Sequence, residues 1–177
     1  MPGLRDYRAF IDDLESELSR IGALLAGQSA STTPCRQGCS DCCRPLSVLP
    51  LEAFAITNSC EPQGSDRNAR ECLPRSCAFL TADHVCAIYP ARPFLCRTRG
   101  FPILHMNGEG DWESDACAKR GFPSLSQGSP GLKLEAWNAR LYKLNEEFCR
   151  QNEIPARRVP IADLRPAQAT ATLPVLR

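Results

Sequence analysis

The sequence predicts a mainly α-helical domain with small irregular β-hairpins, in which a cysteine-rich core is flanked by two long amphipathic helices. Two observations carry this prediction. Apolar residues recur at steps of three and four near both ends of the chain, and 11 of the 177 residues are cysteine, most of them between those periodic segments. We expect one domain over residues 1–152, with a cysteine motif at 35–117, followed by a proline-rich tail at 153–177.

The first helix is predicted over residues 4–25. Its apolar positions form one stripe with charged and polar residues between them, and Gly27 follows as a stop signal. The second helix is predicted from Leu132 to about Gln151, with a similar stripe through Trp137 and Leu141. Because both helices have one apolar face, we expect an antiparallel pair that covers one side of the cysteine region.

Shorter elements are expected between the two helices. A helix should begin near Pro50, since proline is tolerated in a first turn. The apolar runs CAFL and VCAIY, separated by TADH, suit a small hairpin, and PARPFLCR has room for one helical turn. A second extended pair is expected around the turn signal Asn107-Gly108, whereas the polar residues 59–75 read as a variable excursion.

Charge and hydropathy narrow the function classes. The 21 basic and 20 acidic residues are interspersed and leave a net charge of +1, so no basic face for nucleic acid is expected. The chain begins without a basic, then apolar leader and has no apolar run long enough to span a membrane, so a cytoplasmic protein is expected. In a reducing compartment, clustered thiols indicate metal or redox chemistry more often than disulfides.

The local contexts divide the cysteines into two groups. Eight lie in the opening cluster or in segments predicted to be structured, and these are the expected metal ligands: Cys35, Cys39, Cys42, Cys43, Cys77, Cys86, Cys96 and Cys117. Three are expected to be bystanders. Cys60 and Cys72 lie in the polar excursion, and Cys149 lies beside Phe148 on the second helix.

The cysteine motifs also carry a resemblance. The run C-x3-C-x2-C-C, then C-x-F-L and C-x-I-Y-x-x-R-P-x-x-C-R, resembles the bacterial cysteine-cluster family with a CxxCxxCC signature, a zinc- or iron-chelating domain. The first spacing, from Cys35 to Cys39, is one residue longer than that signature. The resemblance implies eight cysteines at a metal site. The motif is also similar to the cysteine-rich part of bacterial flagellin lysine N-methylases. That similarity implies an iron-sulfur cluster as the cofactor. The sequence shows no obvious separate methyl-donor module, so the similarity does not extend to methyl transfer.

Thiolates bind zinc, copper(I) and iron-sulfur clusters. Four suffice for one tetrahedral zinc or one four-iron cluster, so eight could serve two zinc ions, or one cluster and a second site. The adjacent pair Cys42-Cys43 allows two metals, a multinuclear cluster, or one thiol that binds nothing. An iron-sulfur cluster, as 4Fe-4S, is favoured slightly over zinc, ahead of metal-free thiol redox. The alternatives for function are an iron-sulfur-dependent modifying enzyme (methyl transfer or redox) and a structural zinc module for interaction or metal handling.

Arginines and histidines near the cysteine motifs are candidate supporting groups of the metal site. Arg92 and Arg97 are predicted to contact the cysteine ligands without binding the metal themselves. From such a position a guanidinium can lower thiol pKa values and donate hydrogen bonds to sulfur. Arg92 is also expected to bond backbone carbonyls in its turn. His84 and His105 are the only histidines, and each is a candidate auxiliary ligand. Most lone histidines are not ligands, however, and His84 lies in a predicted turn.

Overall fold

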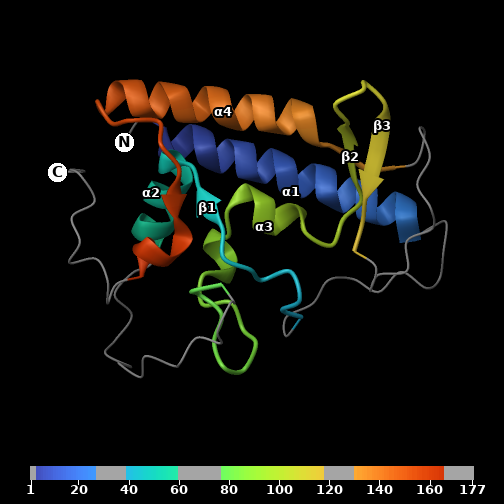
Figure 1. Ribbon diagram of the computed structural model, residues 1–177, viewed down its shortest axis with the longest axis horizontal. Helices are drawn as coiled ribbons and strands as arrows, with labels where there is room; N and C mark the ends of the chain where they lie inside the picture. The colour runs from blue at the N-terminus through green and yellow to red at the C-terminus, as the bar shows by residue number, and fades with distance from the viewer. Residues whose placement is uncertain (1–2, 27–38, 60–76, 118–129, 166–177) are drawn as a thin grey trace.

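The computed structural model describes residues 3–26, 39–59, 77–117 and 130–165 (Figure 1). Its elements, in chain order, are α1 (Leu4–Ala26), β1 (Ser47–Val48), α2 (Pro50–Ser59), the 3-10 helix η1 (Tyr89–Ala91), α3 (Phe94–Thr98), β2 (Ile103–Met106), β3 (Trp112–Asp115), β4 (Leu132–Lys133), α4 (Leu134–Gln151), β5 (Val159–Pro160) and the 3-10 helix η3 (Ile161–Leu164). The prediction of a mainly helical fold with small strands is confirmed. Within these residues, no helix combines the length and the apolar composition needed to cross a membrane.

The two long helices α1 and α4 lie side by side and run in opposite directions, as predicted (Figure 1). Near the start of α1, Gly3 lies against Phe148, whereas further along the helix the ring of Phe10 meets Trp137 with centroids 5.5 Å apart. The apolar stripe of α1 is buried through Leu14, Leu18 and Ile21. The 3.6-residue period therefore places one face of each helix in the interior.

The predicted extended pair around Asn107 is also confirmed. Strands β2 and β3 pair antiparallel, with Ile103 opposite Asp115 and Met106 opposite Trp112, and β4 adds to β2 in parallel. The turn spans more than the Asn-Gly pair, because the side-chain oxygen of Asn107 accepts hydrogen bonds from the backbone N–H groups of Glu109 and Asp111. Every residue of β3 is exposed.

The CAFL and VCAIY runs form a hairpin that is shorter than two full strands. A single bridge joins Leu80 and Cys86, and Thr81 N–H donates to the carbonyl of Val85 at 2.9 Å. Leu80 and Ile88 are buried on its apolar side. The hairpin thus brings Cys86 close to the chain around Leu80 without a regular sheet.

The buried apolar residues form two clusters, with α2 between them. The first cluster lies among α1, α2 and α4 and contains Leu51 and Phe54 of α2. The second contains Ala53 and Ile56 of the same helix, together with residues of the hairpin, of β1 and of η3. Because α2 is apolar on most of its faces, it can contribute to both clusters.

The expectation of a tail that begins at residue 153 does not hold for residues 159–164. Strand β5 pairs antiparallel with β1, with Ser47 opposite Pro160 and Val48 opposite Val159. Ile161 and Leu164 of η3 are buried in the second cluster. The packing of this segment could not be predicted from the sequence, because it is rich in proline and too short to show a periodic apolar pattern.

Candidate metal centre

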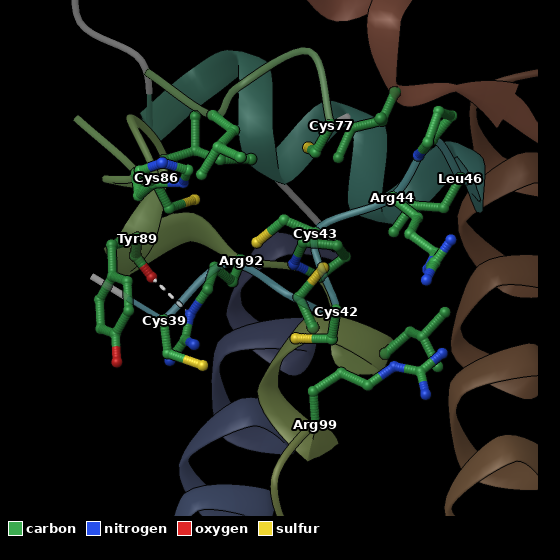
Figure 2. Close-up of a pocket in the computed structure, with 18 residues that line it drawn as sticks. Cys39, Cys42, Cys43, Arg44, Leu46, Cys77, Cys86, Tyr89, Arg92 and Arg99 are labelled. Carbon is green, nitrogen blue, oxygen red and sulfur yellow. Dashed lines mark hydrogen bonds between the residues drawn. The ribbon is translucent and has the colours of Figure 1, made fainter. Parts of the chain in front are cut away.

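Six of the eight predicted cysteine ligands line one pocket of about 290 Å³: Cys39, Cys42, Cys43, Cys77, Cys86 and Cys96. Figure 2 shows the labelled cysteines around one space, with Tyr89 and Arg92 on one side of it. The other lining residues include the apolar Leu80 and Ile88 and the basic Arg44 and Arg99. Cysteines that lie far apart in the sequence are therefore brought together by the fold.

Three segments carry these six cysteines. The loop before β1 carries Cys39, Cys42 and Cys43, the chain through the short hairpin carries Cys77 and Cys86, and α3 carries Cys96. A backbone hydrogen bond joins the first two segments, because Cys77 N–H donates to the carbonyl of Cys43 at 3.1 Å. Helix α3 contacts α1, which fixes the third segment on the helical layer.

The remaining cysteines lie elsewhere. Cys35, Cys60 and Cys72 lie outside the described residues. Cys117 follows β3 and is not among the residues that line the pocket. Cys149 is buried in the first cluster, where its thiol lies 3.8 Å from Oδ1 of Asn145.

Four of the pocket thiols form an inner set: Cys43, Cys77, Cys86 and Cys96. Burial is the main cause that raises the pKa of Cys43 and of Cys96 to about 12, and negative charge on neighbouring pocket thiols is a smaller cause that acts in the same direction. Burial also raises the pKa of Cys86. Cys39 and Cys42 form an outer pair, since both are exposed. Cys43, Cys86 and Cys96 therefore stay protonated at neutral pH without a cation.

Arg92 lies at the edge of the pocket. Its guanidinium is 3.7 Å from the centre of the Tyr89 ring, and its Nε donates to the Tyr89 carbonyl at 3.1 Å (Figure 2). Its charge lowers the pKa of Cys86 and Cys96, but burial outweighs that effect. Figure 2 shows Arg44 and Arg99 on the opposite side of the space from Tyr89.

Arg97 is not among the residues that line this pocket. Its Nε donates to the carbonyl of Arg92 at 2.7 Å. Its two terminal nitrogens donate to the carbonyl of Pro90 and to the carboxylate of Glu15. Arg97 therefore holds the turn at residues 90–92 against α3 and α1, and it is this residue that makes most of the carbonyl contacts expected of Arg92.

Glu52 is a supporting residue that the sequence reasoning missed. The side chain is only 3% exposed, and its two oxygens accept hydrogen bonds from Leu49 N–H at 3.0 Å and Phe94 N–H at 2.9 Å. It therefore joins the start of α2 to the start of α3, the helix that carries Cys96. The available signal was a glutamate in the third position of a helix that begins at Pro50, where a carboxylate can reach back to the cap N–H.

The donor set suits a soft metal or an iron-sulfur cluster, because all six pocket cysteines offer sulfur. Among the described residues, no three His, Cys, Asp or Glu side chains already stand close enough together to hold one metal ion. The thiols instead surround a larger space. The residues fit a thiolate-bound group that is bigger than a single ion, or ions that draw the thiols together.

The part of the chain that carries the pocket cysteines matches a known family model. Residues 34–118 match the CxxCxxCC family model, described as a "putative zinc- or iron-chelating domain". This segment resembles a CxxCxxCC domain. Its range extends one residue beyond each end of the predicted motif at 35–117. Comparisons with curated proteins and with solved structures give no match.

The matched segment, residues 34–118, contains every cysteine that lines the pocket, together with Glu52, the hairpin and α3. The paired helices α1 and α4 lie outside the matched range, as do β5 and η3. One of these outer residues nevertheless reaches the pocket, because Ile161 of η3 lines it. The wall of the pocket therefore includes a residue from outside the matched segment.

Proposed function

We propose that this protein binds a metal centre through Cys43, Cys77, Cys86 and Cys96, and that the centre is a four-iron iron-sulfur cluster rather than zinc. One observation carries the proposal: thiols from three separate segments surround a single pocket inside the matched segment. Four thiolates are the ligand set of one such cluster. Cys39 and Cys42 form the exposed rim of the same pocket.

The protonation of the inner thiols supports cation binding. The raised pKa values of Cys43 and Cys96 mean that these two thiols carry protons until a positive centre arrives, so loading of the metal releases protons. Four thiolates around a +2 core leave a charge of −2, whether the core is one zinc ion or a four-iron cluster. Arg44, Arg92 and Arg99 line the pocket and supply positive charge against that total. The arginines therefore favour a metal centre without choosing between the two.

The size of the pocket supports the cluster over zinc. With a Zn–S distance of about 2.3 Å, two sulfurs on one zinc lie at most about 4.6 Å apart. The described residues contain no trio of ligand side chains gathered around the position of one ion. A multinuclear cluster holds its cysteine ligands further apart, because each thiolate binds a different iron. A pocket of about 290 Å³ is suited to such a group.

An iron-sulfur cluster in this pocket would supply one-electron transfer. The chain's own residues would set its surroundings. Leu80, Ile88 and Ile161 would limit water on the buried side, since they are buried apolar side chains that line the pocket. Arg92, fixed by Tyr89, would keep its positive charge beside the thiolates.

A structural zinc centre is the second candidate, and one observation favours it. Cys77 is buried in the second apolar cluster, and Cys43 and Cys86 pack against that cluster. A metal at these thiols would tie the loop before β1 to the hairpin. In that case metal removal would unfold the second cluster, as expected for zinc sites that contribute to folding.

Cysteine variants test the ligand assignment. We expect Cys43→Ser, Cys86→Ser or Cys96→Ser to reduce the metal bound per chain to less than half. Cys149→Ala is the matched control, because its thiol is also buried but lies in the first cluster and bonds Asn145. Unchanged metal content in all three serine variants would refute the inner set. Cys60→Ser and Cys72→Ser are expected to leave the metal content unchanged.

A further inference from the structure

His84, a candidate auxiliary ligand from the sequence, lines the same pocket as the six cysteines. We propose that Nε2 of His84 is a nitrogen ligand of the metal centre and takes the position of one of the four inner thiolates, so that the centre keeps four protein ligands. The inference rests on the proposed function, since it concerns the metal in that pocket. It places a ligand of a different chemical class in a set otherwise made of sulfur.

The first support is a hydrogen bond that orients the ring. Nδ1 of His84 lies 2.8 Å from the hydroxyl oxygen of Ser40. With the proton on Nδ1, the Ser40 oxygen accepts, and the lone pair of the neutral ring is on Nε2. A histidine that binds metal commonly has its other ring nitrogen hydrogen-bonded in this way, which fixes the tautomer and the ring orientation.

The position of Ser40 strengthens this reading. Ser40 lies in the loop between Cys39 and Cys42, and its carbonyl accepts a hydrogen bond from Cys43 N–H at 2.9 Å. His84 lies two residues before Cys86 on the hairpin. The contact between Ser40 and His84 therefore joins the two segments that carry most of the pocket thiols, at the pocket itself.

The second support is the backbone of His84. Its φ is +59°, in the left-handed region that favours glycine, and its N–H donates to the carbonyl of Thr81 at 3.0 Å to close the turn. A turn of this kind most often has glycine at the left-handed position. A histidine there lowers the stability of the turn, so its side chain is expected to have a use outside the turn.

His105 provides the contrast. It lies on β2, its Nε2 is 3.4 Å from a carboxylate oxygen of Glu113, and it is not among the residues that line the pocket. The sequence offers only these two histidines. Any histidine nitrogen bound to the metal can therefore be assigned by replacing one of them at a time.

The test uses the full chain, purified anaerobically with its metal. Hyperfine spectroscopy on the reduced cluster, or on cobalt(II) placed in the site if the protein carries zinc, should detect one strongly coupled nitrogen. His84→Gly should abolish that coupling while the protein stays folded, because glycine suits the left-handed turn. His84→Asn, which also tolerates this backbone but has no ring nitrogen, should do the same. His105→Ala should keep the coupling.

The outcomes separate the two proposals. A metal-loaded protein without a strongly coupled nitrogen, or with one that persists in His84→Gly, would overturn the assignment of His84 and leave the cysteine site standing. A protein that binds no metal would overturn both. Loss of the coupling in His84→Gly and His84→Asn, with retention in His105→Ala, is the expected result.

Discussion

The carboxylate of Glu52 accepts a hydrogen bond from the backbone N–H of Phe94 at 2.9 Å, across 42 residues of sequence. Phe94 begins α3, and Cys96 lies two residues further along that helix. The other oxygen of Glu52 accepts from Leu49 N–H at the start of α2. The buried side chain of Glu52 therefore holds α3, the helix that carries Cys96, in place against α2.

Replacing Glu52 tests this connection. Glu52→Ala leaves two buried backbone N–H groups without their acceptor, and each such loss costs about 1–3 kcal/mol. We therefore expect the free energy of unfolding, measured with urea, to fall by about 2 kcal/mol or more. Glu147→Ala is the control, because Glu147 is exposed and pairs only within α4. A loss for Glu52→Ala as small as that of the control would contradict the role of Glu52.

Burial of Glu52 also predicts a pH dependence. Burial raises the pKa of its carboxyl, and the hydrogen bonds from Leu49 and Phe94 offset that effect only in part. A raised folded-state pKa favours the folded protein fully below the ordinary carboxyl pKa of about 4.3, and this contribution is lost as the pH rises through the folded-state value. The stability of Glu52→Gln lacks this decline. The measurement is the free energy of unfolding of the natural protein and of Glu52→Gln at a series of pH values. If both free energies change with pH in the same way, the raised pKa of Glu52 is refuted.

Arg97 should be needed as an arginine and not only as a positive charge. Its side chain is 10% exposed and donates to two carbonyls of the turn at residues 90–92 as well as to Glu15. Lysine cannot donate in this forked pattern, so Arg97→Lys should lower the free energy of unfolding by about 1.5–3 kcal/mol. The exposed Arg20, which pairs with Glu17 one turn away on α1, is the matched control for the same change. Equal effects in both variants would show that the turn does not depend on Arg97.

The C-terminal segment should be essential to the domain. Ile161 is 1% exposed, lies in the second cluster and lines the pocket. Ile161→Ala should therefore cost about 2–5 kcal/mol of unfolding free energy. Truncation after Arg158 should cost more, because it also removes Leu164 and the pairing of β5 with β1. Asp163→Ala, at an exposed position of the same helix, should have little effect. A truncated protein as stable as the full chain would restore the expectation of a removable tail.

The sequence predicted most where the signal was local. The three- and four-residue period of α1 and α4 is visible because a helix repeats its buried face every turn. The clustering of the cysteines indicated a common site, because clustered thiols in a reducing compartment more often serve metal or redox chemistry than disulfides. Glu52 and Ile161 were missed because their roles depend on partners far away in the chain. His84 could be named only as one of two candidate auxiliary ligands, because its place in a turn does not show which residues lie opposite that turn.

The iron, acid-labile sulfide and zinc content of the anaerobically purified protein, measured together with its absorption spectrum, tests the proposed centre most directly. We expect about four iron and four sulfide per chain, with broad sulfide-to-iron absorption. The same sample should contain little zinc. A colourless protein with one or two zinc ions per chain and no sulfide would contradict the cluster and leave a structural zinc site in its place.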